Sequence, residues 1–258
     1  TSSVYFYVDT KILATAAKLF NKQDDYTYYT ALAEKIKEAV NNKYLNKETG
    51  IYAGGSQTEL SVPLQWKIVP EDMIAKVAKN LAKKVEEAGF HLDVGVLGAK
   101  AILNALSENG YPETAYKVAA QDTYPSWGWW IVNGATTLLE NWDLKAERDI
   151  SDNHMMFGEI GGWFYKGLGG IFPDPELPGF KHIILRPNFV KELKYFEAKH
   201  DSPYGQIISK WEWNRKKINY EVVVPANSTA TLYLPDYVKG DKVIKLEAGK
   251  HNLNFFIL

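Results

Sequence analysis

The sequence contains no cysteine among its 258 residues. Disulfide bonds and thiolate metal sites are therefore excluded, and the redox compartment is left open. The five histidines show none of the spacings typical of metal ligands, such as His-Glu-x-x-His. Phosphate-binding loops and the Gly-x-Ser-x-Gly motif of serine hydrolases are also lacking. We therefore expect neither a metal nor another cofactor.

A strong net charge is lacking as well. The formal charge is −1, with both signs spread along the chain, so no basic patch for a nucleic-acid partner is expected. No apolar run approaches the roughly 20 residues that span a bilayer, and no signal-peptide pattern is present. The chain begins Thr-Ser-Ser-Val without an initiator methionine, so we expect a processed or cut N-terminus. Cytoplasmic, periplasmic and secreted locations all stay open.

Aromatic residues, by contrast, are abundant, with 8 Trp, 16 Tyr and 11 Phe. Most of them are expected in the core. One stretch, 124–143, gathers four tryptophans around the single glutamate Glu140; they are Trp127, Trp129, Trp130 and Trp142. Sugars stack their C–H faces on indole rings, and carboxyl groups carry out glycoside hydrolysis. The stretch therefore predicts a carbohydrate site.

The hydrophobic pattern divides the chain into residues 1–172, which read as helices, and residues 173–258, which read as strands. Three prolines and a glycine at 171–179 mark the joint. Two kinds of helix alternate in the first region. The amphipathic, charged ones are 24–44, 71–88 and 112–121. The ones that are apolar nearly all round are 4–20, 57–66, 91–106, 127–142 and 154–168.

This alternation of inner and outer helices predicts an incomplete six-hairpin α/α toroid, about four helices short of the twelve that close one. A short helical-repeat solenoid is the alternative, but no fixed sequence period supports it. The second region predicts an antiparallel β-sandwich with a supporting role, since no nucleophile or metal set occurs in it. The expected strands are 182–186, 193–199, 205–214, 217–224, 229–234 and 252–257.

Several polar residues are candidates for chemistry. Glu140 is expected in the last turns of a mostly apolar helix, where a carboxylate is costly unless it is hydrogen-bonded or reactive. The alternative is a structural glutamate bonded to an indole N–H or a threonine hydroxyl. His154, His91 and Gln57 are each expected to open an inner helix. Inner helices of a toroid run the same way, so these residues would ring one mouth, although each alone suits a structural role.

The residues resemble the C-terminal part of bacterial α-L-rhamnosidases of glycoside hydrolase family 78, over nearly the whole chain. The most specific stretch is Tyr-Pro-Ser-Trp-Gly-Trp at 124–129, followed by Asn-Gly-Ala-Thr-Thr-Leu-Leu-Glu-Asn-Trp-Asp at 133–143. Asn-His-x-x-Phe-Gly follows at 153–158. Supporting stretches are His-Leu-x-x-Gly-x-x-Gly at 91–98, Pro-Gly-Phe-Lys-His-Ile-Ile-Leu-Arg-Pro at 178–187 and Asp-Ser-Pro-Tyr-Gly at 201–205.

The resemblance implies an inverting hydrolase of terminal α-L-rhamnosides, with Glu140 as the general base. It implies His154 as a sugar-binding residue, with Trp127 and Trp129 as the aromatic platform; we add His91 to the expected binding residues. The family's general acid lies in an acidic, Arg-containing motif early in the barrel, and no such segment occurs here. We therefore expect a fragment that is inactive or very feeble alone, and that pairs with the missing part of the enzyme or with itself. A fragment of another α/α-toroid glycosidase and a non-catalytic carbohydrate-binding module are the alternatives.

Overall fold

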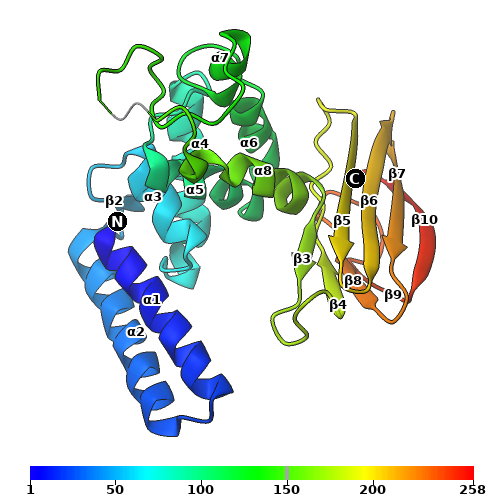
Figure 1. The fold of residues 1–258 in the computed structure, drawn as a ribbon, viewed down its shortest axis with the longest axis horizontal. Coiled ribbons are helices and arrows are strands. Elements are labelled where there is room, and N and C mark those ends of the chain that lie inside the picture. The colour runs from blue at the N-terminus through cyan, green and yellow to red at the C-terminus, as the bar shows by residue number, and fades with distance from the viewer. Residues whose placement is uncertain (149–150) are drawn as a thin grey trace. The chain divides into compact units, whose positions relative to one another are not determined.

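The computed structural model describes residues 1–148 and 151–258, which form two compact units. The first unit, Thr1–Gly158, is helical, and the second, Glu159–Leu258, is built on β-sheets (Figure 1). Each unit is described by itself below. The domain boundary after residue 172 stays a prediction. In the part of the chain that is described, no helix combines the length and apolarity needed to cross a bilayer, and no cluster of acidic or histidine side chains could hold a metal.

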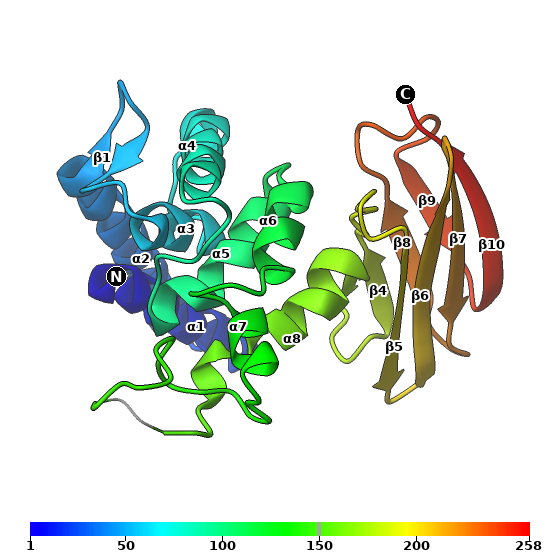
Figure 2. The same ribbon diagram turned by 90° about the horizontal axis from the view of Figure 1, so that it is seen from above.

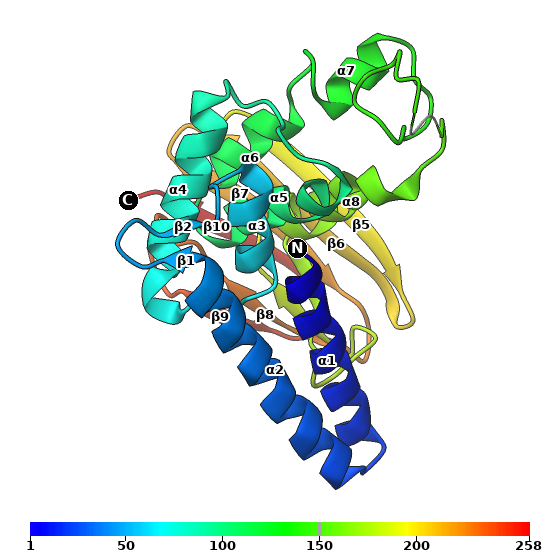
Figure 3. The same ribbon diagram turned by 90° about the vertical axis from the view of Figure 1, so that its left-hand side faces the viewer.

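The helical unit consists of successive helical hairpins, as the alternating pattern predicts. The helices α1 (Ser2–Leu19) and α2 (Gln23–Tyr44) lie side by side (Figure 3). The short strands β1 (Leu45–Asn46) and β2 (Ile51–Tyr52) then lead into the next helices. These are α3 (Gln57–Gln65), η1 (Glu71–Met73), α4 (Ile74–Glu87), α5 (Val96–Glu108) and α6 (Pro112–Ala119).

Burial within these hairpins follows the expected layers except at α1. Helix α5 is buried along most of its length, whereas α4 buries one face only. The prediction of a fully buried helix over residues 4–20 is wrong. Ile12 is 61% exposed and Leu19 is 76% exposed, so one apolar side of α1 is uncovered in this structure.

The predicted helix over residues 127–142 is also wrong, because α7 spans only Trp127–Val132. Ser126 caps its start by accepting the N–H of Trp129. Gly134 has φ +88, and the Ala135 N–H donates to the Trp130 carbonyl while the Gly134 N–H donates to that of Ile131. This is a Schellman motif, in which a left-handed glycine ends the helix. Glu140 consequently lies in a loop rather than on a helix.

Two other expected helices begin later or break up. Helix α5 begins at Val96, so His91 lies in the preceding loop and does not open the helix. The expected helix 154–168 is divided into three short pieces, with His154 as the N-cap of the first. The pieces are η2 (Met155–Phe157), α8 (Glu159–Trp163) and the π-helical η3 (Phe164–Leu168).

The second unit contains two four-stranded sheets, visible as two layers in Figure 2. One sheet has the order β10-β7-β6-β5 and is antiparallel throughout. The other has the order β3-β4-β8-β9. The bounds are β3 (Ile171–Pro173), β4 (His182–Leu185), β5 (Tyr195–Ser202), β6 (Gly205–Asn214), β7 (Lys217–Val224), β8 (Thr229–Tyr233), β9 (Val243–Leu246) and β10 (Gly249–Phe256).

The second sheet differs from the expectation in three respects. Strands β4 and β8 pair in parallel, because the chain leaves this sheet after β4 and builds β5–β7 in the other before it returns. Strand β9 was not expected, and its alternation is weak, with only Leu246 buried. Strand β3 lies inside the segment expected to be a linker and pairs with β4.

Polar side chains from β6 attach the segment before β3 to the sheet. The Trp211 indole N–H donates to the Leu168 carbonyl (2.9 Å), and the Ser209 hydroxyl donates to the Gly169 carbonyl (2.6 Å). The Tyr220 hydroxyl shares a 3.0 Å hydrogen bond with Ser209, and burial raises the pKa of this phenol. Residues 159–170 therefore fold with the sheets, which explains why the helical unit ends at Gly158.

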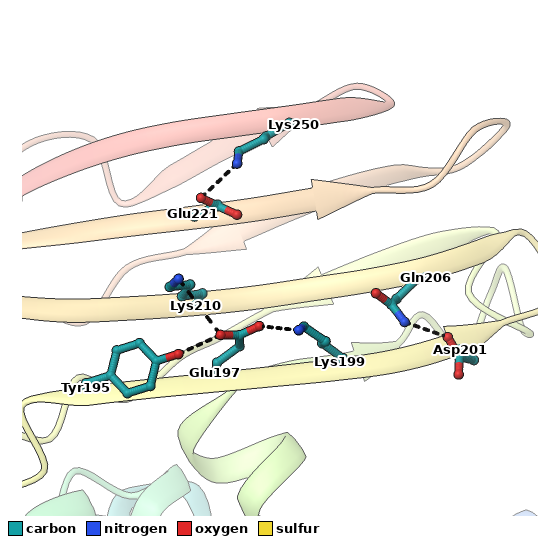
Figure 4. A network of polar contacts seen from close by, with 8 residues as sticks. All are labelled: Tyr195, Glu197, Lys199, Asp201, Gln206, Lys210, Glu221 and Lys250. Carbon is teal, nitrogen blue, oxygen red and sulfur yellow. Dashed lines mark hydrogen bonds and ion pairs between the residues drawn. The ribbon is translucent and has the colours of Figure 1, made fainter.

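The outward face of the antiparallel sheet carries a row of paired charges (Figure 4). Glu197 contacts the Lys199 ammonium at 2.7 Å and accepts the Tyr195 hydroxyl at 2.5 Å. Lys199, and then Tyr195, hold the pKa of Glu197 below its usual range. Glu221 and Lys250 form a further pair at 3.0 Å. The first pair lies within β5 and the second joins β7 to β10, and paired charges of this kind are typical of a solvated sheet face.

Candidate active site

Two loop segments of the helical unit, 137–140 and 151–154, lie antiparallel and bring the expected base and sugar-binding residues together. The Glu140 N–H donates to the Ser151 carbonyl (3.0 Å), and the His154 N–H donates to the Leu138 carbonyl (2.8 Å). The Thr137 hydroxyl adds a bond to the Asp152 carbonyl. We call this pairing the loop clasp.

Glu140 and His154 face each other at one end of the loop clasp. Glu140 Oε1 lies 3.7 Å from His154 Nε2, and Glu140 Oε2 accepts the Ser151 N–H at 3.3 Å. The Met156 N–H donates to His154 Nδ1 (3.4 Å), so the neutral imidazole carries its proton on Nε2, toward the carboxylate. Their side chains are 30% and 27% exposed. Both side chains are thus accessible to a ligand, and they place a proton acceptor, the Glu140 carboxylate, beside a hydrogen-bond donor, the His154 N–H.

An aromatic cluster packs beside the loop clasp. Trp142 stacks on Trp130 with ring centroids 4.6 Å apart and an interplanar angle of 23°. Phe157 meets Trp142 edge-on at 4.5 Å, and Trp127 does so at 5.4 Å. The cluster joins the chain after Glu140 to the chain after His154.

The two expected platform residues have different surroundings. Trp127 is 4% exposed and donates its indole N–H to the Phe157 carbonyl (3.0 Å), so its ring is packed inside the aromatic cluster. Trp129 is half-buried, and its ring lies 6.1 Å from that of the exposed Tyr124. Trp129 is thus the more exposed of the two tryptophans, and stacking on a sugar needs an accessible ring.

His91 and Gln57 are brought together, although not as two helix starts. The buried Gln57 side chain donates to the His91 carbonyl and accepts the Asp93 N–H, both at 2.9 Å. His91 Nε2 lies 2.7 Å from the Thr123 hydroxyl, so its imidazole already has a protein partner. One residue beyond Asp93, the Val94 carbonyl accepts the Trp142 indole N–H at 2.7 Å. The 91–94 loop is therefore fixed between Gln57 and Trp142.

Sequence reasoning missed the loop clasp itself. Its hydrogen bonds are made by main-chain groups and by one hydroxyl, on Thr137, Ser151 and Asp152. No residue type is typical of such main-chain pairing. A signal did exist in Gly134, because a glycine after a short helical run is typical of a helix end. Recognising that end would have placed Glu140 in a loop.

Comparison with known proteins gives two family matches. Residues 1–168 match the bacterial alpha-L-rhamnosidase 6 hairpin glycosidase domain, and residues 170–249 match the bacterial alpha-L-rhamnosidase C-terminal domain. An alpha-L-rhamnosidase from Formosa agariphila is 31% identical over 240 residues, which are 90% of this chain and 26% of the relative.

Solved structures give the same result. An alpha-L-rhamnosidase from Dictyoglumus thermophilum superposes with a TM-score of 0.87 at 34% identity, covering 99% of this chain and 31% of that one. A Streptomyces avermitilis alpha-L-rhamnosidase complexed with L-rhamnose has a TM-score of 0.84 at 27% identity, covering 99% and 26%. The chain thus spans less than a third of the length of these relatives.

Proposed function

Since the chain belongs to the bacterial α-L-rhamnosidase family, we propose that it is part of an inverting glycosidase that cleaves terminal α-L-rhamnosides, with Glu140 as general base. The observation that carries the proposal is the Glu140–His154 pair, a carboxylate and an imidazole N–H 3.7 Å apart and partly exposed. The L-rhamnose in a related structure supports the choice of sugar.

In the proposed reaction, a Glu140 oxygen accepts a proton from water as the water oxygen bonds to the anomeric carbon. The bond from that carbon to the leaving oxygen breaks, and the leaving oxygen keeps the electron pair. Attack on the face opposite the leaving group inverts the anomeric centre. The Nε2–H group of His154 donates a hydrogen bond to a sugar hydroxyl, and Trp129 stacks on the apolar face of the ring.

The leaving oxygen needs a proton from a second carboxyl group, held about 6.5–9.5 Å from the base in inverting enzymes. We assign this general acid to a part of the enzyme outside these 258 residues. The same part would cover the apolar side of α1, where Ile12 and Leu19 are exposed. A second copy of the chain covering this side is the competing partner.

The test separates the base from the acid by choice of leaving group. The dinitrophenolate of a dinitrophenyl α-L-rhamnoside leaves without protonation, whereas the methoxy oxygen of methyl α-L-rhamnoside must be protonated to leave. We expect the purified chain to hydrolyse only the former, releasing β-L-rhamnose first, as seen by NMR. Glu140→Gln should lower the rate about 10²- to 10⁴-fold, whereas Glu147→Gln, a change at an exposed glutamate of the same loop, should have no effect.

Three outcomes would overturn the proposal. One is equal hydrolysis of the methyl and dinitrophenyl rhamnosides by the chain alone, which would mean that no outside general acid is needed. Another is hydrolysis that Glu140→Gln leaves unchanged, which would indicate a non-catalytic sugar-binding module if rhamnose still binds. The third is release of the α-anomer first, which would exclude inversion.

A further inference from the structure

Trp142 is the residue at which the segments carrying the expected site residues meet. It follows Glu140 by two positions. Its indole N–H donates to the Val94 carbonyl at 2.7 Å, in the loop that also contains His91. Its ring contacts Phe157, three residues after His154, with centroids 4.5 Å apart.

Both the ring and the backbone of Trp142 are fixed. The ring stacks on Trp130, and the Trp130 indole N–H donates to the Trp142 carbonyl at 3.3 Å. The acceptor of the Trp142 N–H lies on Val94, a residue only 7% exposed, where water is a poor substitute. Trp142 therefore has a defined position relative to three parts of the chain.

The loop clasp needs such an anchor. Two antiparallel segments joined by a few hydrogen bonds are marginally stable in water unless they pack against something else. Thr137 and Ser151 are exposed, so the clasp buries little apolar surface of its own. The contact between Trp142 and Phe157 supplies the packing, one ring from each side of the clasp.

We propose that Trp142 is a positioning residue that fixes the separation of Glu140 and His154, which rests on the function proposed above for that pair. It touches no substrate. It acts by holding the Glu140 segment on Val94 and the His154 segment on Phe157. Loss of its N–H bond loosens the clasp and moves the carboxylate away from its place beside the imidazole.

The test uses Trp142→Phe, which keeps an aromatic ring and removes the N–H group. The matched control is Trp66→Phe, because among the described residues the buried Trp66 N–H has no hydrogen-bond partner. The readout is hydrogen exchange at the Glu140 and His154 amides, which make the clasp bonds. We expect about tenfold faster exchange at both in Trp142→Phe, unchanged exchange in α5, and no effect of Trp66→Phe.

A second variant and a second readout keep the test decisive if Trp142→Phe does not fold. Phe157→Leu removes the ring contact but keeps the Trp142 N–H bond, and it should also accelerate exchange at His154. With the activated rhamnoside, Trp142→Phe should lower kcat about tenfold and change KM less, since the Glu140 carboxylate is displaced while the platform residue Trp129 stays.

The outcomes separate this inference from the function on which it rests. Unchanged exchange at both clasp amides in Trp142→Phe, or equal acceleration in Trp66→Phe, overturns the positioning role even when hydrolysis depends on Glu140. Faster clasp exchange in Trp142→Phe, together with rhamnoside hydrolysis that Glu140→Gln leaves unchanged, supports the anchor and overturns the proposed function instead.

Discussion

Replacing Gln57 by leucine should destabilise the helical unit strongly. The Gln57 side chain is fully buried, and both ends of its amide bind main-chain groups, the His91 carbonyl and the Asp93 N–H. Leucine fills a similar volume but satisfies neither group. Each unpaired buried polar group costs about 1–3 kcal/mol. Because His91 and Asp93 are themselves partly exposed, water can bind their freed main-chain groups and reduces this cost. We therefore expect the free energy of unfolding to fall by about 2–3 kcal/mol.

The same helix offers a matched control. Gln65 stands at the other end of α3, and its Oε1 is buried without a hydrogen-bond partner in the described part of the chain. Gln65→Leu therefore removes an unsatisfied group and should be neutral or stabilise the unit by up to about 1 kcal/mol. The same chemical change is thus expected to lower the free energy of unfolding at one end of the helix and not at the other.

The assay is urea unfolding followed by far-ultraviolet circular dichroism, which reports mainly on the helices. The unfolding midpoint should fall for Gln57→Leu and stay or rise for Gln65→Leu, with equal slopes. Amide exchange at Asp93 should accelerate in the first variant only. Equal midpoints for the two variants would refute the reasoning, because packing rather than hydrogen bonding would then decide both sites.

Three further predictions concern other parts of the chain. Tyr220→Phe should cost about 1 kcal/mol in thermal unfolding of the sheet unit, since Ser209 keeps its bond to the Gly169 carbonyl; no change would contradict the buried bond. The Ser56 N–H holds the pKa of Glu59 below its usual range. This carboxylate therefore stabilises the fold at pH values above the usual pKa of a glutamate, and the contribution is lost as pH falls through the lowered pKa. Glu59→Gln should flatten the acid limb of the stability profile, and an unchanged limb would be the contrary result. The exposed apolar side of α1 should cause self-association, which light scattering would detect. The double substitution Ile12→Lys with Leu19→Glu should restore the monomer. A monomer at all concentrations of the unsubstituted chain would show that this side does not drive association.

The sequence predicts those elements whose packing is amphipathic and local. Helix α2 and strands β6 and β7 fall within one residue of their expected bounds, because each has a regular period and clear turn residues at its ends. The order of helices and then strands is confirmed too. The parallel pairing of β4 with β8 was missed because it depends on a crossover between sheets, which no local pattern encodes.

The sequence predicts that Glu140 and His154 lie near each other, but it does not predict how the chain brings them together. Glu140 and His154 do lie together, but the expected reason, neighbouring barrel helices, is wrong, since Gly134 ends α7 and the loop clasp makes the contact. Trp127 was expected to face a sugar, yet its indole N–H is used within the aromatic cluster. Residue types thus indicate the chemistry, whereas main-chain pairing, which has no residue signature, determines the geometry.

The Schellman motif at Gly134 has a consequence for how such a site can change. A continuing helix would place Glu140 at a rotation fixed by about 100° per residue, so one inserted residue would turn the carboxylate away from its partner. On a loop, an insertion after Ala135 can be absorbed by the turn while the pairing with Ser151 is kept. A change in the length of this loop can therefore alter the position of the Glu140 carboxylate relative to His154 without altering the helices before and after the loop.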